Sequence, residues 1–173
     1  MDAVVRAWLG FFALGAVLIH LALVIGSPLP VGIPLLLVGI AEFAWGVFAF
    51  TAPRTPFPRA ARIGALLPIL GWIVLLLAGG STDLGVRVLP MLVASLLDLS
   101  IAIAISVMLR RTPPAEPRPL RPGPYLFGLG LGAVVVGALT TPALAATEAG
   151  DFAQPHGTQV ETPYDLPDQH PAH

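Results

Sequence analysis

The chain has 173 residues, of which 55% are hydrophobic and only 11% are charged, and its net charge at pH 7 is -1. In a soluble domain about a quarter of all residues are charged, and a chain this short needs many polar residues because its surface is large for its volume. The composition therefore excludes an ordinary water-soluble domain and predicts a membrane protein. The near-zero net charge provides no basic field for nucleic acid. The absence of cysteine excludes disulfides, thiolate zinc sites, iron–sulfur clusters and cysteine nucleophiles.

The first apolar segment covers about residues 4–26 and contains His20. It is too long for the core of a signal peptide, and no cleavage site of small residues follows it, so we expect a transmembrane helix. The stretch Ser27–Pro30 ends this helix, because its prolines interrupt the helical hydrogen bonds. The second apolar segment covers about residues 33–50 and contains Glu42.

The third segment, about residues 63–78, follows a connection with three prolines and three arginines. The fourth, about 88–109, contains Asp98, and the fifth, about 125–145, follows a second connection rich in proline and arginine. Residues 147–173 are polar, proline-rich and acidic, and we expect them to form a flexible tail. The sequence thus predicts an all-α, polytopic membrane helix bundle with about five transmembrane helices.

Arginine is distributed unevenly among the connections. Eight of the nine basic residues fall on one side of the bundle formed by residues 1–146, and Arg87 falls on the other side. Because positive residues collect in cytoplasmic loops, we expect a multi-pass protein of the plasma membrane with its N-terminus inside and its C-terminal tail extracytoplasmic. Five crossings from an inside start agree with an outside end. The eight are Arg6, Arg54, Arg59, Arg62, Arg110, Arg111, Arg118 and Arg121.

The fifth segment admits a second interpretation. Residues 118–146 contain arginines, an apolar run and the sequence Ala143-Leu144-Ala145 before Ala146, which is the pattern that signal peptidase cleaves. Cleavage after Ala145 would release a peptide that begins at Ala146. The alternative is an uncleaved span that happens to end in small residues, and an intact-mass measurement distinguishes the two.

Three ionisable residues, His20, Glu42 and Asp98, fall inside the expected spans. Each costs roughly 2.5–3.5 kcal/mol to insert into a membrane. At a rise of 1.5 Å per residue they lie about 9 to 15 Å below the outer ends of their helices, so they can share one polar site that is open towards the outside. The group suits a Zn²⁺ or Cu²⁺ ion or a proton relay. Alternatively, each is a structural hydrogen-bonding group between helices.

Two further residues or motifs bear on the packing of these helices. Trp45 follows Glu42 by three residues and lies on the same helix face, so its indole N–H is expected to reach the Glu42 carboxylate. Gly128 and Gly132 form a Gly-x-x-x-Gly motif at the start of the fifth span, which is typical of closely packed membrane helices. This motif packs the fifth helix either on the bundle or on a partner chain.

The expected tail contains three of the four histidines, His156, His170 and His173, among acidic residues. Neutral imidazoles bind Cu²⁺ or Zn²⁺, and histidine-bearing tracts are a compositional indication of metal binding. The tail is therefore a second candidate metal site, and a merely solvated tail is the alternative.

Several stretches carry a resemblance to a known class of protein. They are WLGFFALGAVLIHLALV in the first span, LLLVGIAEFAWGVFAF in the second, LDLSIAIAI in the fourth, and the exit TTPALAATEAGDFAQPHG with histidines after it. On these stretches the chain resembles small multi-span membrane proteins of actinobacteria that have no assigned function and a His-bearing extracytoplasmic C-terminal tail. The resemblance covers most of the chain and implies location and topology, not a reaction. The tail of this chain is poorer in histidine than that pattern, which weakens its metal interpretation.

The sequence does not predict an enzyme. It has no Ser–His–Asp set, phosphate-binding loop or metalloprotease helix, and its connections are too short to hold a catalytic domain. We expect a membrane protein that handles a divalent metal, copper or zinc, at its outer face. The tail would capture the ion, and His20, Glu42 and Asp98 would accept it or move charge.

Two other functions stay open at this stage. The first is an accessory or assembly subunit of a larger membrane complex, in which the intramembrane polar groups and Gly128 and Gly132 contact a membrane-protein partner or a second copy of the chain. The second is a small proton-coupled transporter with Glu42 and Asp98 as proton carriers, which ranks third because the five spans show no inverted repeat. The expected surroundings in each case are the lipid bilayer, with no nucleic acid.

Overall fold

The computed structural model describes residues 3–52, 54–77, 87–110 and 122–153. Within these ranges there is no strand, and five helices are long and apolar enough to cross a membrane. The chain is therefore a multi-pass helical membrane protein, which confirms the predicted fold class. The helices are α1 (Ala3–Val24), α2 (Leu29–Thr51), α3 (Pro58–Leu77), α5 (Val88–Arg110), α6 (Pro122–Ala145) and the short α7 (Glu148–Asp151).

Three of the helices begin earlier than predicted. Helix α2 begins four residues before the expected start at residue 33, α3 five before residue 63, and α6 three before residue 125. In each case a proline that was expected to interrupt the helix instead lies in its first turn: Pro30, Pro58 and Pro122. A proline is tolerated there, because the first N–H groups of a helix have no intrahelical acceptor.

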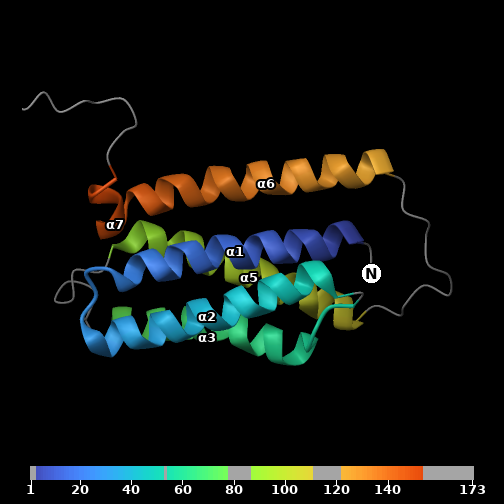
Figure 1. Cartoon of the computed structure of the whole chain (residues 1–173). Helices are drawn as coiled ribbons and strands as arrows, with labels where there is room; N and C mark the ends of the chain where they lie inside the picture. The colour runs from blue at the N-terminus through green and yellow to red at the C-terminus, as the bar shows by residue number, and fades with distance from the viewer. Residues whose placement is uncertain (1–2, 53, 78–86, 111–121, 154–173) are drawn as a thin grey trace, which may run out of the picture.

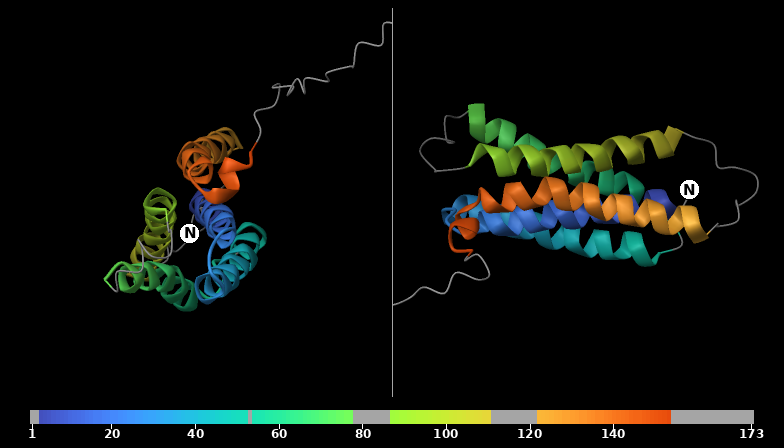
Figure 2. Two further views of the ribbon diagram at one scale, coloured as in Figure 1. Left: turned by 90° about the vertical axis from the view of Figure 1, so that its left-hand side faces the viewer. Right: turned by 90° about the horizontal axis from the view of Figure 1, so that it is seen from above.

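The five long helices run alternately in opposite directions (Figure 1). Seen along the bundle, α1, α2, α3 and α5 are arranged in a ring, and α6 lies outside the ring against α1 (Figure 2). Helix α1 contacts α2, α5 and α6 and is the most buried of the five, and α3 packs mainly on α5. The contact between α2 and α3 is much sparser, so these two helices are the most loosely packed neighbours in the ring.

Glycines on one face of α2 hold it close to α1. They recur every seven residues, at Gly32, Gly39 and Gly46. A methyl group added to Gly39 would lie 2.9 Å from the Leu21 side chain, and one added to Gly46 would lie 3.2 Å from the Ala13 methyl. Small residues allow helix backbones to approach closely in membranes. Glu42 lies between the last two glycines at helical spacing, three residues after one and four before the other, so the same face that packs on α1 carries its carboxylate.

A turn of helix closes the bundle at the C-terminal end of α6 (Figure 1). Thr147 is buried and caps α7, with its side chain accepting a hydrogen bond from the Gly150 amide at 3.2 Å. The guanidinium of Arg87, just before α5, donates to the carbonyls of Ala146 and Thr147 at 3.1 and 3.3 Å and pairs with Asp151.

The ordered turn differs from the flexible tail that was expected from residue 147, because capping and the arginine contacts satisfy its backbone groups. The remaining tail residues lie outside the described ranges. Ala143 and Ala145 belong to α6, and Ala143 is fully buried. Cleavage after Ala145 stays a prediction.

Candidate metal centre

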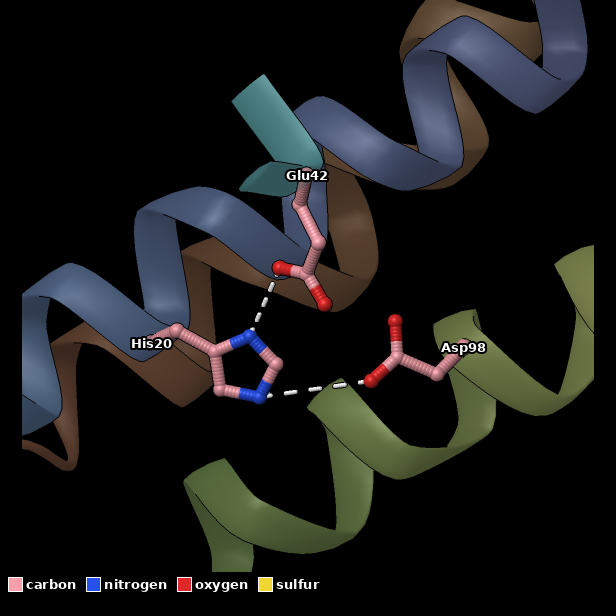
Figure 3. A group of neighbouring side chains, drawn as sticks. All are labelled: His20, Glu42 and Asp98. Atoms are coloured by element: carbon pink, nitrogen blue, oxygen red, sulfur yellow. Dashed lines mark hydrogen bonds and ion pairs between the residues drawn. The ribbon is translucent and has the colours of Figure 1, made fainter. Parts of the chain in front are cut away.

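Three side chains from three helices meet inside the bundle (Figure 3). His20 comes from α1, Glu42 from α2 and Asp98 from α5, and one potential ligand atom of each lies within 4.8 Å of the others. The side chains of His20 and Asp98 are fully buried, and that of Glu42 is 12% exposed. The structure thus brings together the three ionisable residues that the sequence placed at a similar depth.

The imidazole of His20 faces both carboxylates from one side (Figure 3). Its Nδ1 is 2.8 Å from Oε2 of Glu42, and its Nε2 is 4.0 Å from Oδ2 of Asp98. In a neutral ring that donates to an ionised carboxylate, the proton must be on Nδ1, and the lone pair is then on Nε2. A carboxylate that fixes the tautomer in this way is the usual support for a metal-binding histidine.

Four polar atoms of this group have no hydrogen-bond partner among the described residues. They are Nε2 of His20, Oε1 of Glu42 and both carboxylate oxygens of Asp98. A buried polar group without a partner costs about 1–3 kcal/mol, and a charged group costs more. All four atoms can act as electron-pair donors, so an electrophile between them would satisfy the whole set at once.

A divalent transition metal fits these donors. Imidazole nitrogen and carboxylate oxygen are ligands for Zn²⁺ and Cu²⁺, whereas Ca²⁺ requires six to eight oxygens. Two donors around zinc lie roughly 3.4 Å apart, which is close to the 4.0 Å between His20 Nε2 and Asp98 Oδ2. A movement of about half an ångström therefore lets both ligate one ion, while Glu42 holds the opposite ring nitrogen.

Trp45 does not support Glu42, and that prediction was wrong. Its indole nitrogen instead donates to the carbonyl of Pro56 at 2.9 Å, in the connection before α3. A carbonyl outside a helix lacks the partner that helical carbonyls have, so it competes well for the indole N–H. The Glu42 oxygen that Trp45 was expected to satisfy stays without a partner in the described part of the chain.

Gly128 and Gly132 pack α6 on α1 within the same chain. A methyl group added to Gly128 would lie 2.8 Å from Val4, and one added to Gly132 would lie 3.1 Å from the indole nitrogen of Trp8. That nitrogen also donates to the Gly128 carbonyl at 2.8 Å. Both glycines therefore lie against α1 in this chain, and contact with a partner chain stays a prediction.

The histidines of the expected tail, His156, His170 and His173, lie outside the described residues. Sequence reasoning missed the contacts of Arg87 with α7, since a lone arginine on the less basic side carries no pattern. It also missed that α2 and α3 leave a space beside Glu42 and Asp98. The small residues on α3 were the only feature of the sequence that could have indicated this space.

Comparison with known proteins adds no family to this description. No protein family, curated protein or solved structure matches the chain. The function must therefore be inferred from the site itself.

Proposed function

We propose that this membrane protein binds one divalent transition metal ion, Zn²⁺ or Cu²⁺, between His20, Glu42 and Asp98. The observation that supports the proposal is that one potential ligand atom of each of the three side chains lies within 4.8 Å of the others, and that each side chain carries a buried donor atom without a partner among the described residues. Glu42 orients the imidazole through Nδ1, and Nε2 and the Asp98 carboxylate ligate the ion.

Charge balance favours the same occupant. If both carboxylates are ionised and the imidazole is neutral, the group carries two negative charges, which a low-dielectric interior does not tolerate without compensation. A divalent cation neutralises the pair completely, so the loaded site has no net charge. Among the described residues, no lysine or arginine is paired with Glu42 or Asp98 to compensate them from within the chain.

The proposal extends to the C-terminal tail and the side of the membrane on which it lies. The arginine distribution predicts that the C-terminal tail is extracytoplasmic. We propose that His156, His170 and His173 bind the ion weakly on that side and that the bundle site accepts it. The protein then handles metal without chemical transformation, in the plasma membrane.

Titration of the purified protein with Zn²⁺, Cu²⁺, Mg²⁺ and Ca²⁺ against a chromophoric chelator tests the site. We expect one ion of Zn²⁺ or Cu²⁺ per chain at micromolar affinity or better, and no competition by Mg²⁺ or Ca²⁺. The variant His20→Gln should weaken binding by about a hundredfold, because the amide is a poor ligand for these metals. Binding no tighter than millimolar would sink the proposal.

A matched control separates the site from general effects of a polar residue in the bundle. Ser106 on α5 bonds to its own helix through the Ala102 carbonyl at 2.7 Å, so Ser106→Ala should leave the metal affinity unchanged. The triple variant with alanine at His156, His170 and His173 should still bind one metal ion tightly in the bundle and should lose only the weaker binding of ions to the tail. If the triple variant removes the tight equivalent, the ion binds in the tail and not in the bundle.

A further inference from the structure

A groove runs along the bundle between α2 and α3, which contact each other sparsely. Its larger part is a cavity of about 460 Å³, which lies in the size range of sites for small molecules. Its lining on the α3 side extends from Phe57, just before the helix, to Leu67, or about 15 Å along the helix axis. One leaflet supplies half of a hydrocarbon core that is about 30 Å thick, so the cavity has the length of one acyl chain.

Small residues on α3 create this cavity. Its wall on that helix consists mainly of Ala60, Ala61, Gly64 and Ala65. A methyl group added to Gly64 would meet no atom within 4 Å, so side chains of the described chain do not fill the space. Glu42 and Asp98 border the cavity in the middle of the bundle, but their unpartnered oxygens are buried. The groove therefore offers an apolar surface, which suits a hydrocarbon chain.

The cavity reaches the end of the bundle at which α1 begins, beside the connection from α2 to α3 (Figure 1). Phe57 lines the cavity and is also 80% exposed, so it lies at the mouth. Trp45, on the α2 wall, donates its indole N–H to the Pro56 carbonyl at 2.9 Å. This hydrogen bond holds the connection against the groove.

Three arginines lie at the same end of the bundle. Arg54 is an exposed residue of the connection, and Arg59 and Arg62 are among the first five residues of α3. None of the three forms an ion pair with a described residue. The acidic residues of the described ranges lie in the middle of the bundle or at its other end: Glu42, Asp98, Glu148 and Asp151. The mouth of the cavity thus carries positive charge that the described chain does not neutralise.

We propose that the α2–α3 groove binds an anionic phospholipid, with its phosphate at Arg54, Arg59 and Arg62 and one acyl chain in the cavity. Guanidinium groups bind phosphate through charge-assisted hydrogen bonds, and basic residues next to membrane helices attract anionic lipids. The depths agree, because the arginines lie at the helix ends, where lipid headgroups are. The acyl chain runs from there towards the middle of the membrane and fills the space that the small residues of α3 leave.

Charge also argues against a second copy of the chain as the occupant. A copy in the same orientation would bring its own arginines to the same level of the membrane, where like charges repel. An anionic headgroup instead neutralises them. The arginine distribution predicts that this lipid belongs to the cytoplasmic leaflet.

This inference goes beyond the proposed metal site and uses none of its ligand atoms. His20 does not line the cavity, and the arginines lie at the end of the bundle. A failure of lipid binding therefore leaves the metal proposal intact, and the reverse also holds.

Quenching of tryptophan fluorescence tests the groove, because Trp45 lines the cavity. The probes are phosphatidylglycerol and phosphatidylcholine with the same brominated acyl chains, added to the full chain in neutral detergent. Each arginine near the phosphate contributes about fivefold in affinity for an anionic lipid. We therefore expect saturable quenching that is at least about tenfold tighter for phosphatidylglycerol at low salt, and high salt should reduce this preference.

Variants of the arginines test the headgroup part of the site. With glutamine at Arg54, Arg59 and Arg62, the preference for phosphatidylglycerol should disappear. With lysine at the same three positions it should remain, because the attraction depends on charge. Arg87→Gln, at the other end of the bundle, is the matched control and should keep the preference.

Variants of the cavity wall test the acyl-chain part. Gly64→Leu fills the cavity and should weaken quenching by both lipids about tenfold, with the preference between them unchanged. Ala60→Leu on the same wall should act in the same way. Gly137→Leu on α6, where an added methyl group also meets no atom within 4 Å, should change neither affinity. Equal melting temperatures verify that these variants fold.

Three results would overturn the proposal. They are equal affinities for the two lipids, a preference that persists in the glutamine variant, and unchanged quenching in both Gly64→Leu and Ala60→Leu. Loss of the preference in millimolar inorganic phosphate would assign the arginines to a soluble anion instead. A dimer in native mass spectrometry that Gly64→Leu dissociates and the lipid does not would assign the groove to a second copy.

Discussion

The Nδ1 atom of His20 lies 2.8 Å from Oε2 of Glu42, across the closely packed pair α1 and α2. Gly39 and Gly46 bring the two helices together on either side of this contact. Asp98 approaches from α5 and stays 4.0 Å from the other ring nitrogen. One half of the site is therefore fixed by helix packing, and the other half is open for a ligand to close.

Removal of the charge on Glu42 tests its role as the residue that orients His20. In Glu42→Gln the amide oxygen can still accept from Nδ1, but the ring loses its anionic partner. We expect metal affinity to fall about 10- to 100-fold with no loss of folded protein. Competition with a chromophoric chelator measures the change. An affinity equal to that of the unmodified chain would contradict the role of Glu42.

The variant Asp98→Leu distinguishes a functional carboxylate from a structural one. Asp98 is fully buried and neither of its oxygens has a partner among the described residues. Without metal, replacement by leucine should therefore raise the free energy of unfolding by about 1–3 kcal/mol, while metal binding is lost. Unfolding in mixed micelles with a chelator present measures the stability.

The control for this variant is Ser100→Leu, on the same helix. Ser100 bonds to the Leu96 carbonyl of its own helix at 2.7 Å. Its replacement therefore measures how much any added apolar residue on α5 raises the free energy of unfolding, and we expect this increase to be smaller than in Asp98→Leu. If Asp98→Leu instead destabilises the bundle, the carboxylate is a structural group between helices and the metal proposal loses its main ligand.

The packing of α6 on α1 gives a prediction that is independent of the site. A leucine at position 132 must displace Trp8 and Phe11, whose atoms would lie 3.1 and 3.2 Å from the first added carbon. Gly132→Leu should therefore lower the free energy of unfolding by about 1–3 kcal/mol. Gly130→Leu is the matched control, because a methyl group there meets no atom within 4 Å. Equal stabilities of the two variants would refute this packing.

Hydropathy predicted the five helices because lipid requires long apolar runs whose backbone groups are bonded internally. It missed the early starts of α2, α3 and α6, since the same proline that breaks a helix interior is favoured in a first turn. Residue counting also placed His20, Glu42 and Asp98 at a similar depth. It could not give the rotation of the helices, which the glycine face of α2 determines for Glu42.

Other features depend on tertiary contacts that no local pattern encodes. Trp45 shares a helix face with Glu42, yet its indole bonds to Pro56 in the next connection. The turn α7 lies in a polar, acidic stretch, and it is held by Arg87, which is 64 residues away from Asp151 in the sequence. The groove between α2 and α3 arises because two helices that are adjacent in sequence contact each other sparsely.

The contact of Arg87 with α7 should control the order of residues 147–153. Arg87 donates to the carbonyls of Ala146 and Thr147, which connect α6 to α7, and it pairs with Asp151. Asp151 raises the pKa of Arg87 above its ordinary value. The guanidinium therefore stays charged at neutral pH, and its charge is lost as the pH rises above the ordinary guanidinium range. Both side chains are largely exposed, 42% and 52%, so salt should weaken the pair.

Hydrogen exchange measured by mass spectrometry tests this contact. In Asp151→Asn we expect amides 147–153 to exchange about two- to fivefold faster, the range of an exposed ion pair, and high salt should have the same effect on the unmodified chain. Arg87→Lys should give an intermediate rate, because lysine keeps the charge but lacks the planar fork that reaches several acceptors at once. Metal affinity should be unchanged in all three cases, since the pair lies at the end of the bundle. Unchanged exchange in Asp151→Asn would mean that the Thr147 cap alone orders the turn.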